Sequence, residues 1–381
     1  MRIVMSCALG AVLAFYISWG QTPQAASGSA PQKKQGGRGG PRGPGPMDSL
    51  LVKDWKPDSS LVVPVTNVPK AKFRAIDVHS HTYLRTPEEI ANWVRTMDAV
   101  GIETTVVLSG ATGQQFDSLV ELFLKPYPGR FQLYCGIDTT DIDAPDYPQR
   151  ATAELVRCYR KGARGVGEIS DKGSGLSRSQ LLPRDKRLHP DDRRLDLFWD
   201  KCAELKLPVN LHMADHPSAW RPPDAHQERT PNYQQYNQYG HDVPSYEEVL
   251  ALRDRALDRH PKTRFILCHL GNQGNDLASA AKLLDKFPGV YMDISARAYE
   301  VGRQPRFATK FLTKYKDRVL WGTDLNPSQE MYHAWWRLFE TTDEYMPSDT
   351  GWRLFGLDLP DSVLEPLYRG NAKRLLNWEK M

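Results

Sequence analysis

RAIDVHSH, residues 74–81, is a short, mostly apolar run that ends in two closely spaced histidines. Its length and apolar character are typical of a buried strand. Seven similar runs follow, and longer stretches with helical periodicity separate them. They are TTVVLS (104–109), FQLYCGID (131–138), ARGVGEIS (163–170), PVNLHMAD (208–215), RFILCHLG (264–271), VYMDISAR (290–297) and RVLWGTDLN (318–326). Strands that alternate with helices in this way pair in parallel through right-handed crossovers.

The spacing of the eight runs favours a closed barrel over an open sheet. Between positions 74 and 318 the chain makes seven steps, so that one strand–helix unit takes about 35 residues, against roughly 31 in an average barrel. No glycine-rich motif follows the first run, which argues against a dinucleotide-binding fold. Capping boxes at Thr86 and Ser245 indicate where two of the intervening helices begin. We therefore predict an α/β fold, a single-domain (β/α)8 TIM barrel.

One connection is too long for an ordinary strand-to-helix loop. Between Asp215 and Ser245 the chain is polar, aromatic and rich in proline, without helical periodicity. Loops of this length usually carry a function or are disordered. Trp220 and the tyrosines of this segment favour ordered packing, so we expect a lid-like loop after the fifth strand.

The N-terminal region differs in composition from the rest of the chain. Arg2 precedes an apolar run that ends at Trp19, and small residues follow, as in a secretory signal. An uncleaved membrane anchor is the alternative. We predict a signal peptide at 1–28, a flexible Gly/Pro-rich tether and lead-in at 29–72, and a catalytic domain at 73–381. The mature protein would then be exported to a periplasmic or extracellular location, without stable membrane insertion.

Charge and cysteine content exclude several kinds of protein. The formal net charge is +4, and the first 46 residues hold five basic and no acidic residues, which leaves −1 for the remainder. A nearly neutral body lacks the basic surface that nucleic acids require. The chain has five cysteines and no CxxC, so neither a disulfide framework nor a cysteine zinc site is indicated. We expect a small-molecule substrate; the oligomeric state stays open, and a homo-oligomer is one alternative.

Several potential metal ligands lie at the ends of predicted strands. His79 and His81 are two residues apart on the first strand, and a period of two places both on one face, which we take to be the barrel interior. His212, His269 and Asp324 lie near the ends of the fifth, sixth and eighth strands. In a TIM barrel these ends converge on one site. Imidazole and carboxylate donors around an open coordination position are typical of a catalytic metal centre.

The motifs IDVHSH, NLHMAD, ILCHLGN, LWGTDLN and LYRGNAKRLL resemble the amidohydrolase superfamily. The resemblance extends from about Phe73 to the C-terminus and is closest to the amidohydrolase-related branch that includes aminocarboxymuconate-semialdehyde decarboxylase-like enzymes. It implies that His79, His81, His212 and Asp324 hold the metal. By the same resemblance, His269 binds a second metal or acts as an acid, a base or a polarising group.

Four further residues have two interpretations each. Glu168 takes the place where many family members carry a metal-bridging lysine or glutamate, but it could instead be a buried acid paired with an arginine. Arg297 and Arg303 follow the seventh strand and could bind a substrate carboxylate, or form salt bridges with neighbouring acids. His216 could reach the substrate from the long loop, or lie at the surface.

These residues and the resemblance predict a metal-dependent hydrolase. A metal-activated water would attack an amide, ester or lactone, with Asp324 as the base and His269 stabilising the oxyanion. The alternative is a metal-dependent, non-oxidative decarboxylase on the same ligands. A non-catalytic binding protein is a third hypothesis, which the complete set of ligands disfavours. Zinc is the expected metal, with manganese or iron as alternatives, and one or two ions fit the pattern.

Overall fold

All eight apolar runs form strands in the computed structural model, which describes residues 45, 47–176, 182–229, 231–348 and 350–376. The strands are β1 (Ala75–Ser80), β2 (Ile102–Ala111), β3 (Phe131–Cys135), β4 (Gly165–Asp171), β5 (Val209–Met213), β6 (Phe265–Leu267), β7 (Tyr291–Asp293) and β8 (Val319–Leu320). They form one parallel sheet in the order β1 to β8. Hydrogen bonds from Val78 N to Trp321 O and from Asp324 N to His79 O join its two edges. The predicted TIM barrel is confirmed.

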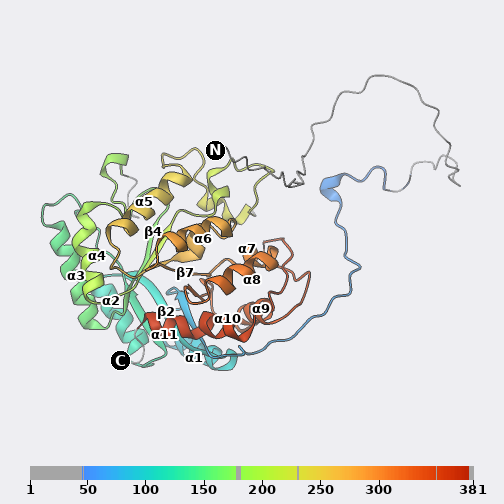
Figure 1. Ribbon diagram of the computed structural model, residues 1–381, viewed down its shortest axis with the longest axis horizontal. Helices are drawn as coiled ribbons and strands as arrows, with labels where there is room; N and C mark the ends of the chain where they lie inside the picture. The colour runs from blue at the N-terminus through green and yellow to red at the C-terminus, as the bar shows by residue number, and fades with distance from the viewer. Residues whose placement is uncertain (1–44, 46, 177–181, 230, 349, 377–381) are drawn as a thin grey trace, which may run out of the picture. The chain divides into compact units, whose positions relative to one another are not determined.

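Helices follow the strands and surround them (Figure 1). The longer ones are α1 (Pro87–Val100), α2 (Gly113–Leu119), α3 (Tyr147–Lys161), α4 (Asp196–Glu204), α5 (Tyr246–Arg259), α6 (Leu277–Lys286), α7 (Ala298–Arg303), α8 (Pro305–Lys314), α9 (Gln329–Glu340), α10 (Asp361–Glu365) and α11 (Asn371–Leu375). The predicted capping boxes are present. Thr86 and Glu89 form the one at the start of α1, and Ser245 and Glu248 form the one at the start of α5.

Two groups of buried side chains stabilise the barrel. The larger one lies between strands and helices and includes Trp93, Trp199 and Trp336. The smaller one joins apolar residues from β1, β2, β3, β6 and β8 to α11. Because strands from different sides of a barrel can meet only in its interior, this second group fills the barrel, and the C-terminal helix packs against it.

The last three strands are shorter than the apolar runs that predicted them. After β6, residues His269 to Asn272 have φ between 56° and 64°, and after β8 Asp324 has φ of 54°. This left-handed backbone cannot continue a strand. Both departures from extended geometry therefore occur at residues whose side chains the sequence analysis assigns to the site.

The N-terminal residues form a separate unit. The chain divides into Met1–Leu61 and Val62–Met381. In the described part of the first unit there is a single 3-10 turn, η1 (Val52–Asp54), without buried residues. The predicted signal peptide at 1–28 lies outside the described residues, as does most of the tether before residue 47, so export stays a prediction. Within the part of the chain that the structure covers, no helix has the length and hydropathy that a membrane crossing requires.

Candidate active site

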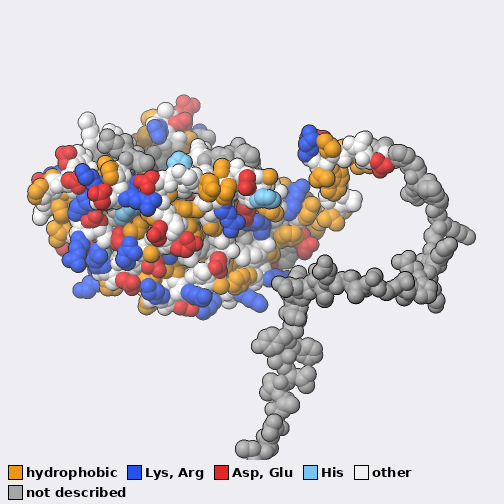
Figure 2. Space-filling view, turned by 90° about the horizontal axis from the view of Figure 1, so that it is seen from above, with side chains coloured by type: hydrophobic (Ala, Val, Ile, Leu, Met, Phe, Trp, Pro, Cys, Tyr) orange, Lys and Arg blue, Asp and Glu red, His pale blue; other side chains and the backbone are white. Residues whose placement is uncertain are grey.

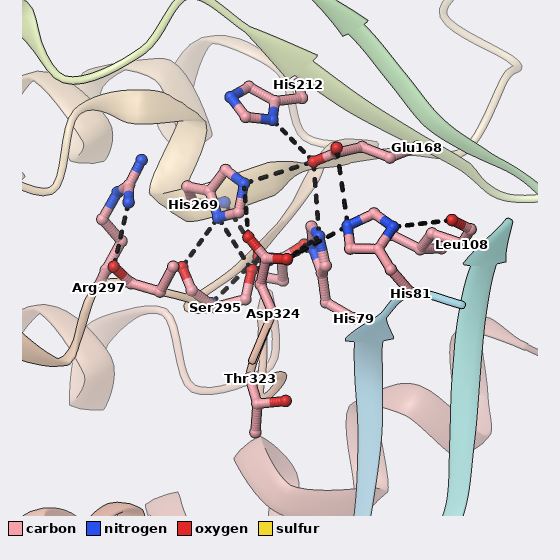
Figure 3. A network of polar contacts seen from close by, with 12 residues as sticks. His79, His81, Leu108, Glu168, His212, His269, Ser295, Arg297, Thr323 and Asp324 are labelled. Carbon is pink, nitrogen blue, oxygen red and sulfur yellow. Dashed lines mark hydrogen bonds and ion pairs between the residues drawn. The ribbon is translucent and has the colours of Figure 1, made fainter. Parts of the chain in front are cut away.

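Six side chains with nitrogen or oxygen donors converge at the C-terminal ends of the strands (Figure 3). They are His79 of β1, His81 just beyond β1, Glu168 of β4, His212 of β5, His269 just beyond β6 and Asp324 beyond β8. These are the six residues that the sequence analysis assigns to metal binding or catalysis. The structure brings all of them together.

Glu168 lies at the centre of the four histidines (Figure 3). Its Oε1 atom is 2.7 Å from His212 Nδ1 and 3.4 Å from both His79 Nε2 and His269 Nε2. Its Oε2 atom is 3.9 Å from His81 Nε2. Burial alone would raise the pKa of this carboxyl, but His212 and the other rings hold the pKa well below its ordinary value. Glu168 is therefore an anion in the middle of the site. The structure pairs Glu168 with histidines and not with an arginine, which was the alternative given in the sequence analysis.

Asp324 forms the opposite wall of this cluster. Its Oδ1 atom is 3.2 Å from His81 Nε2, and its Oδ2 atom is 3.8 Å from His269 Nε2. Tyr83 donates a hydrogen bond of 2.7 Å to Oδ1. The backbone fixes its position: Asp324 N donates to His79 O at 2.8 Å. Although burial opposes it, His79 and His81 hold the pKa of Asp324 below its usual range, so that this side chain is also a carboxylate.

Hydrogen bonds behind three of the histidines set the direction of their rings. Nδ1 of His79 is 3.0 Å from Asp293 Oδ2, and Nδ1 of His81 is 2.9 Å from Leu108 O. Nδ1 of His269 is 2.9 Å from the carbonyl oxygen of Ser295. A ring that donates from Nδ1 to a carboxylate or carbonyl keeps the lone pair of Nε2 for a metal. In all three rings Nε2 faces Glu168 or Asp324, so the arrangement is that of metal ligands.

The donors fit a divalent metal in their chemistry as well as their position. Nε2 of His79 is buried and, among the described residues, has no hydrogen-bond partner. Although burial opposes protonation, Asp293 and the other acids raise the pKa of His79 to about 10, which shows that the surroundings favour positive charge at this ring. Burial lowers the pKa of His212 to about 4 and keeps that imidazole neutral, as a ligand must be. Neutral imidazoles and carboxylates suit zinc, manganese or iron.

Potential ligand atoms form four overlapping groups among the described residues, and two of these groups consist only of the six site residues. The atoms of His79, His81 and Asp324 lie within 4.8 Å of one another, and so do those of Glu168, His212 and His269. Each group could hold one ion. The arrangement therefore accommodates either one ion or two, and in the second case Glu168 and His269 would belong to the second position.

A cavity of about 730 Å³ opens next to these ligands. Its lining is His81, Tyr83, Glu168, Ser170, Lys172, Ser174, Gly175, His212, Asp215, Arg229, Tyr233, Tyr236, Gln238, His269, Ala296, Arg297, Asp324 and Leu325. Three cationic side chains are part of it: Lys172, Arg229 and Arg297. The cavity thus combines the predicted metal ligands with groups that attract an anion.

The three predicted substrate-binding residues have different positions. Arg297 lines the cavity and is also ion-paired with Glu300 at 3.1 Å. His216 does not belong to the lining, and it is buried rather than at the surface. Its Nδ1 accepts from Ser218 N, and burial lowers its pKa to about 3. Arg303 also lies outside the lining and binds Glu228 at 2.5 Å. The salt bridges that the sequence analysis gave as alternatives are therefore present for both arginines.

The long loop after β5 takes part in the site. It contains two 3-10 turns, η5 (Pro217–Trp220) and η6 (Pro231–Tyr236), and Tyr233 and Tyr236 line the cavity. Trp220 and Tyr239 do not: Trp220 donates to Pro244 O and packs on Tyr246, whereas Tyr239 is exposed. Only part of the loop is thus in the position that a lid over the ligands would need.

Four charged or aromatic residues of the lining were not identified as site residues from the sequence. Tyr83 follows the HxH pair by two residues, and Asp215 ends the run PVNLHMAD, so the rule of strand ends could have included both. Lys172 directly follows β4 and could have been found in the same way. Arg229 lies within an irregular loop, where no periodicity indicates which side chains point inward.

Comparisons with known proteins agree with this geometry. A family model described as amidohydrolase matches residues 69–378. A search of curated protein sequences found no match. Among solved structures, the chain is similar to a 2,6-dihydroxybenzoate decarboxylase complexed with 2,6-dihydroxybenzoate, at 18% identity and a TM-score of 0.50, over 81% of this chain and 99% of that one.

Two further structures are similar at the same level. One is a dihydroxybenzoic acid decarboxylase from Polaromonas sp. JS666 with bound manganese and the inhibitor 2-nitroresorcinol, at 18% identity and a TM-score of 0.50, over 81% of this chain and 98% of that one. The other is an uncharacterized TIM-barrel protein from Bordetella bronchiseptica, at 16% identity and a TM-score of 0.52, over 81% and 99%. Identities this low show a shared fold.

Proposed function

We propose that this chain, which belongs to the amidohydrolase family, is a metal-dependent lyase. Its reaction would remove the carboxyl group of a small aromatic acid without oxidation. The observation that carries the proposal is the cavity, in which Lys172, Arg229 and Arg297 face the same space as the predicted metal ligands. The lining also holds the carboxylates of Glu168, Asp215 and Asp324, so a divalent ion bound among the ligands would make this space positive, which favours an anionic substrate. Two structures with the same fold are decarboxylases of dihydroxybenzoic acids, which supports decarboxylation as the first candidate. Hydrolysis, which the sequence alone favoured, becomes the second candidate.

By the family resemblance the metal would be held by His79, His81, His212 and Asp324. The ligand atoms of His79, His81 and Asp324 lie close together, whereas those of His212 group with Glu168 and His269. When bound, a divalent ion supplies a Lewis acid that polarises the oxygen atoms of the substrate. Zinc is the metal that the sequence predicts. Manganese is an equal candidate, because imidazole and carboxylate donors suit it and because one of the similar structures contains it.

The protein side chains would orient the substrate acid and deliver one proton to it. Arg297 offers donors to the carboxylate that is removed. When the bond between the ring carbon and the carboxyl carbon breaks, its electron pair stays on the ring carbon and carbon dioxide leaves. The ring carbon then takes a proton. Asp324 faces the cavity, with 24% of its side chain exposed against 10% for Glu168, and is the better placed acid to pass a proton from water to that carbon.

Hydrolysis of an amide, ester or lactone stays a second candidate because of one observation. Glu168 contacts His79 of one ligand group and His212 and His269 of the other. A carboxylate in this position suits a pair of ions, which would supply an activated water for the attack. Asp324 would then take the proton of the attacking water, and His269 would stabilise the oxyanion.

One experiment separates the two reactions. The purified protein is loaded with manganese or with zinc and incubated with carboxyl-labelled hydroxybenzoic acids, with esters and with lactones. We expect labelled carbon dioxide from at least one aromatic acid, its loss after chelation, and its return when metal is added. Release of acid from an ester or lactone without carbon dioxide would support the hydrolase instead. Neither product on the whole panel would contradict both.

We also propose that residues 1–28 direct export of this enzyme. An N-terminal sequence of the native protein that begins after about Gly20 would support the proposal. An intact Met1 in a cytosolic fraction would contradict it.

A further inference from the structure

We propose that Lys172 and Arg229 form an anion subsite beside the metal centre, and that it recognises a second carboxylate of the substrate. This inference rests on the proposed function, because it names the class of acid that the cavity takes. The substrate would be an aromatic dicarboxylic acid, which loses one carboxyl group and is held by the other. The Lys172–Arg229 subsite consists of these two cations, Asp215 between them, and the rings of Tyr233 and Tyr236.

The two cations share one buried carboxylate. Lys172 Nζ lies 2.8 Å from Asp215 Oδ2, and Arg229 Nη1 lies 3.0 Å from Asp215 Oδ1. The side chains of Lys172 and Arg229 are 24% and 11% exposed, so protein encloses most of each side chain. Although burial opposes it, the two cations hold the pKa of Asp215 far below its ordinary value. Asp215 therefore neutralises one of the two positive charges, and one remains.

Most of the hydrogen-bond donors of this pair have no acceptor within the part of the chain that the structure describes. Arg229 donates one hydrogen bond there, to Asp215, although a guanidinium has five N–H groups. Lys172 likewise donates one, to Asp215, although an ammonium has three. Leaving buried charged donors without acceptors is costly. One excess charge and several donors without an acceptor among the described residues, at the wall of a cavity, match a bound carboxylate.

Aromatic rings hold the two cations in place and shape the subsite. Lys172 Nζ is 4.4 Å from the centre of the Tyr236 ring, and the guanidinium carbon of Arg229 is 4.1 Å from that of Tyr233. Both tyrosines line the same cavity. Cation–π contacts of this kind fix the position of the charge without using its hydrogen-bond donors. The tyrosines also offer rigid apolar surface for a flat ring.

On the face shown in Figure 2, basic and acidic side chains are interspersed, without a broad area of one sign. The proposed selection of an anion rests on contacts inside the cavity, to which Lys172 and Arg229 each contribute a positive charge. Each of the two residues can therefore be tested by a substitution of its own.

Binding of simple aromatic acids to the metal-loaded protein tests the inference. We compare benzoate with the three benzenedicarboxylates by calorimetry. We expect at least one dicarboxylate to bind about tenfold or more tightly than benzoate, because a charge-assisted hydrogen bond discriminates by about that factor. Lys172→Met and Arg229→Met should each remove most of this preference while leaving the affinity for benzoate within about threefold. Metal content should stay unchanged.

A surface arginine and a conservative variant provide the controls. Arg255→Met removes an arginine on α5 that pairs with Asp191 outside the cavity, and it should keep the full preference. If Arg229→Met does not fold, Arg229→Lys keeps a partner for Asp215 but loses the fork of N–H groups, and it should weaken the dicarboxylate alone. The inference is overturned if no dicarboxylate binds more tightly than benzoate, or if the preference survives in both Lys172→Met and the arginine variant. If the preference for a dicarboxylate depends on Lys172 but no carbon dioxide is released, the subsite is supported and the decarboxylation is refuted.

Discussion

The hydroxyl group of Tyr83 should contribute to catalysis through Asp324, and Tyr83→Phe tests this directly. The hydroxyl donates a hydrogen bond of 2.7 Å to Asp324 Oδ1, and the Tyr83 ring lies edge-on to His81 at 5.6 Å. Phenylalanine keeps the ring and its packing, so that only the hydrogen bond is lost. We therefore expect the metal content and the thermal midpoint to change little.

The size of the effect follows from the surroundings of Asp324. A hydrogen bond to a charged group contributes about 1.5–3 kcal/mol when it is shielded from water. Asp324 is 24% exposed and keeps His81 at 3.2 Å, so the lower end of this range applies. We expect kcat/KM for carbon dioxide release to fall roughly 10- to 30-fold, which corresponds to about 1.4–2 kcal/mol.

The assay compares kcat/KM, metal content and thermal midpoint in the parent, in Tyr83→Phe and in a matched control. Tyr315→Phe removes a hydroxyl that also donates to a carboxylate, that of Asp285 at 2.9 Å, outside the cavity. This control should leave kcat/KM within about twofold. An unchanged kcat/KM in Tyr83→Phe would refute the role assigned to the Tyr83 hydroxyl. Loss of metal in that variant would also refute it, because the effect would then be on metal binding.

Three further predictions concern the acid, the loop and the pH dependence of stability. Asp324→Asn should lower kcat by about 10²- to 10⁴-fold, because asparagine cannot carry the proton. His269→Gln should keep most of its metal. Equal kcat in Asp324→Asn and the parent would exclude Asp324 as the proton carrier. Replacing residues 222–240 with a short Gly/Ser linker should leave metal content nearly intact but change kcat/KM or the preferred acid; a variant with the parent's activity and selectivity would show that the loop is not a lid. The hydrogen bonds of Arg157 lower the pKa of Glu154 from 4.5 to about 2 in the folded protein. Between these two pH values the unfolded chain binds more protons than the folded one. The stabilisation of the fold by ionised Glu154 is therefore present above pH 4.5 and is lost as the pH falls towards 2. By urea denaturation, Glu154→Gln should be about 1–2 kcal/mol less stable than the parent at pH 7, a value reduced for solvent screening, and the difference should narrow below about pH 5; a constant difference would contradict this cause.

The barrel and the ligand cluster were predictable from the sequence because both depend on regular geometry. Parallel strands end at the same side of a barrel, so His79, His212 and Asp324 could be placed together without any knowledge of loops. The exact contacts could not be predicted. The central position of Glu168 depends on which way its side chain turns within β4, which the residue pattern does not encode.

The residues around the substrate were harder to predict, for different reasons. His216 follows His212 closely in the chain, but its ring turns back to accept a hydrogen bond from Ser218 and does not line the cavity. Arg229 was missed because tertiary contacts, to Asp215 and Tyr233, determine its position within an irregular loop. Strand periodicity thus predicts the chemistry of the centre, whereas specificity depends on loops that have no period.

The metal content of the purified protein tests the central claim most directly. Elemental analysis is made on the parent, on His79→Ala and on His212→Ala after each has been incubated with manganese or zinc and freed of unbound metal. We predict at least one divalent ion per chain in the parent and clearly less metal in either variant, because His79 and His212 each belong to one of the two groups of ligand atoms. A parent that retains no metal, or a full complement of metal in both variants, would contradict the account.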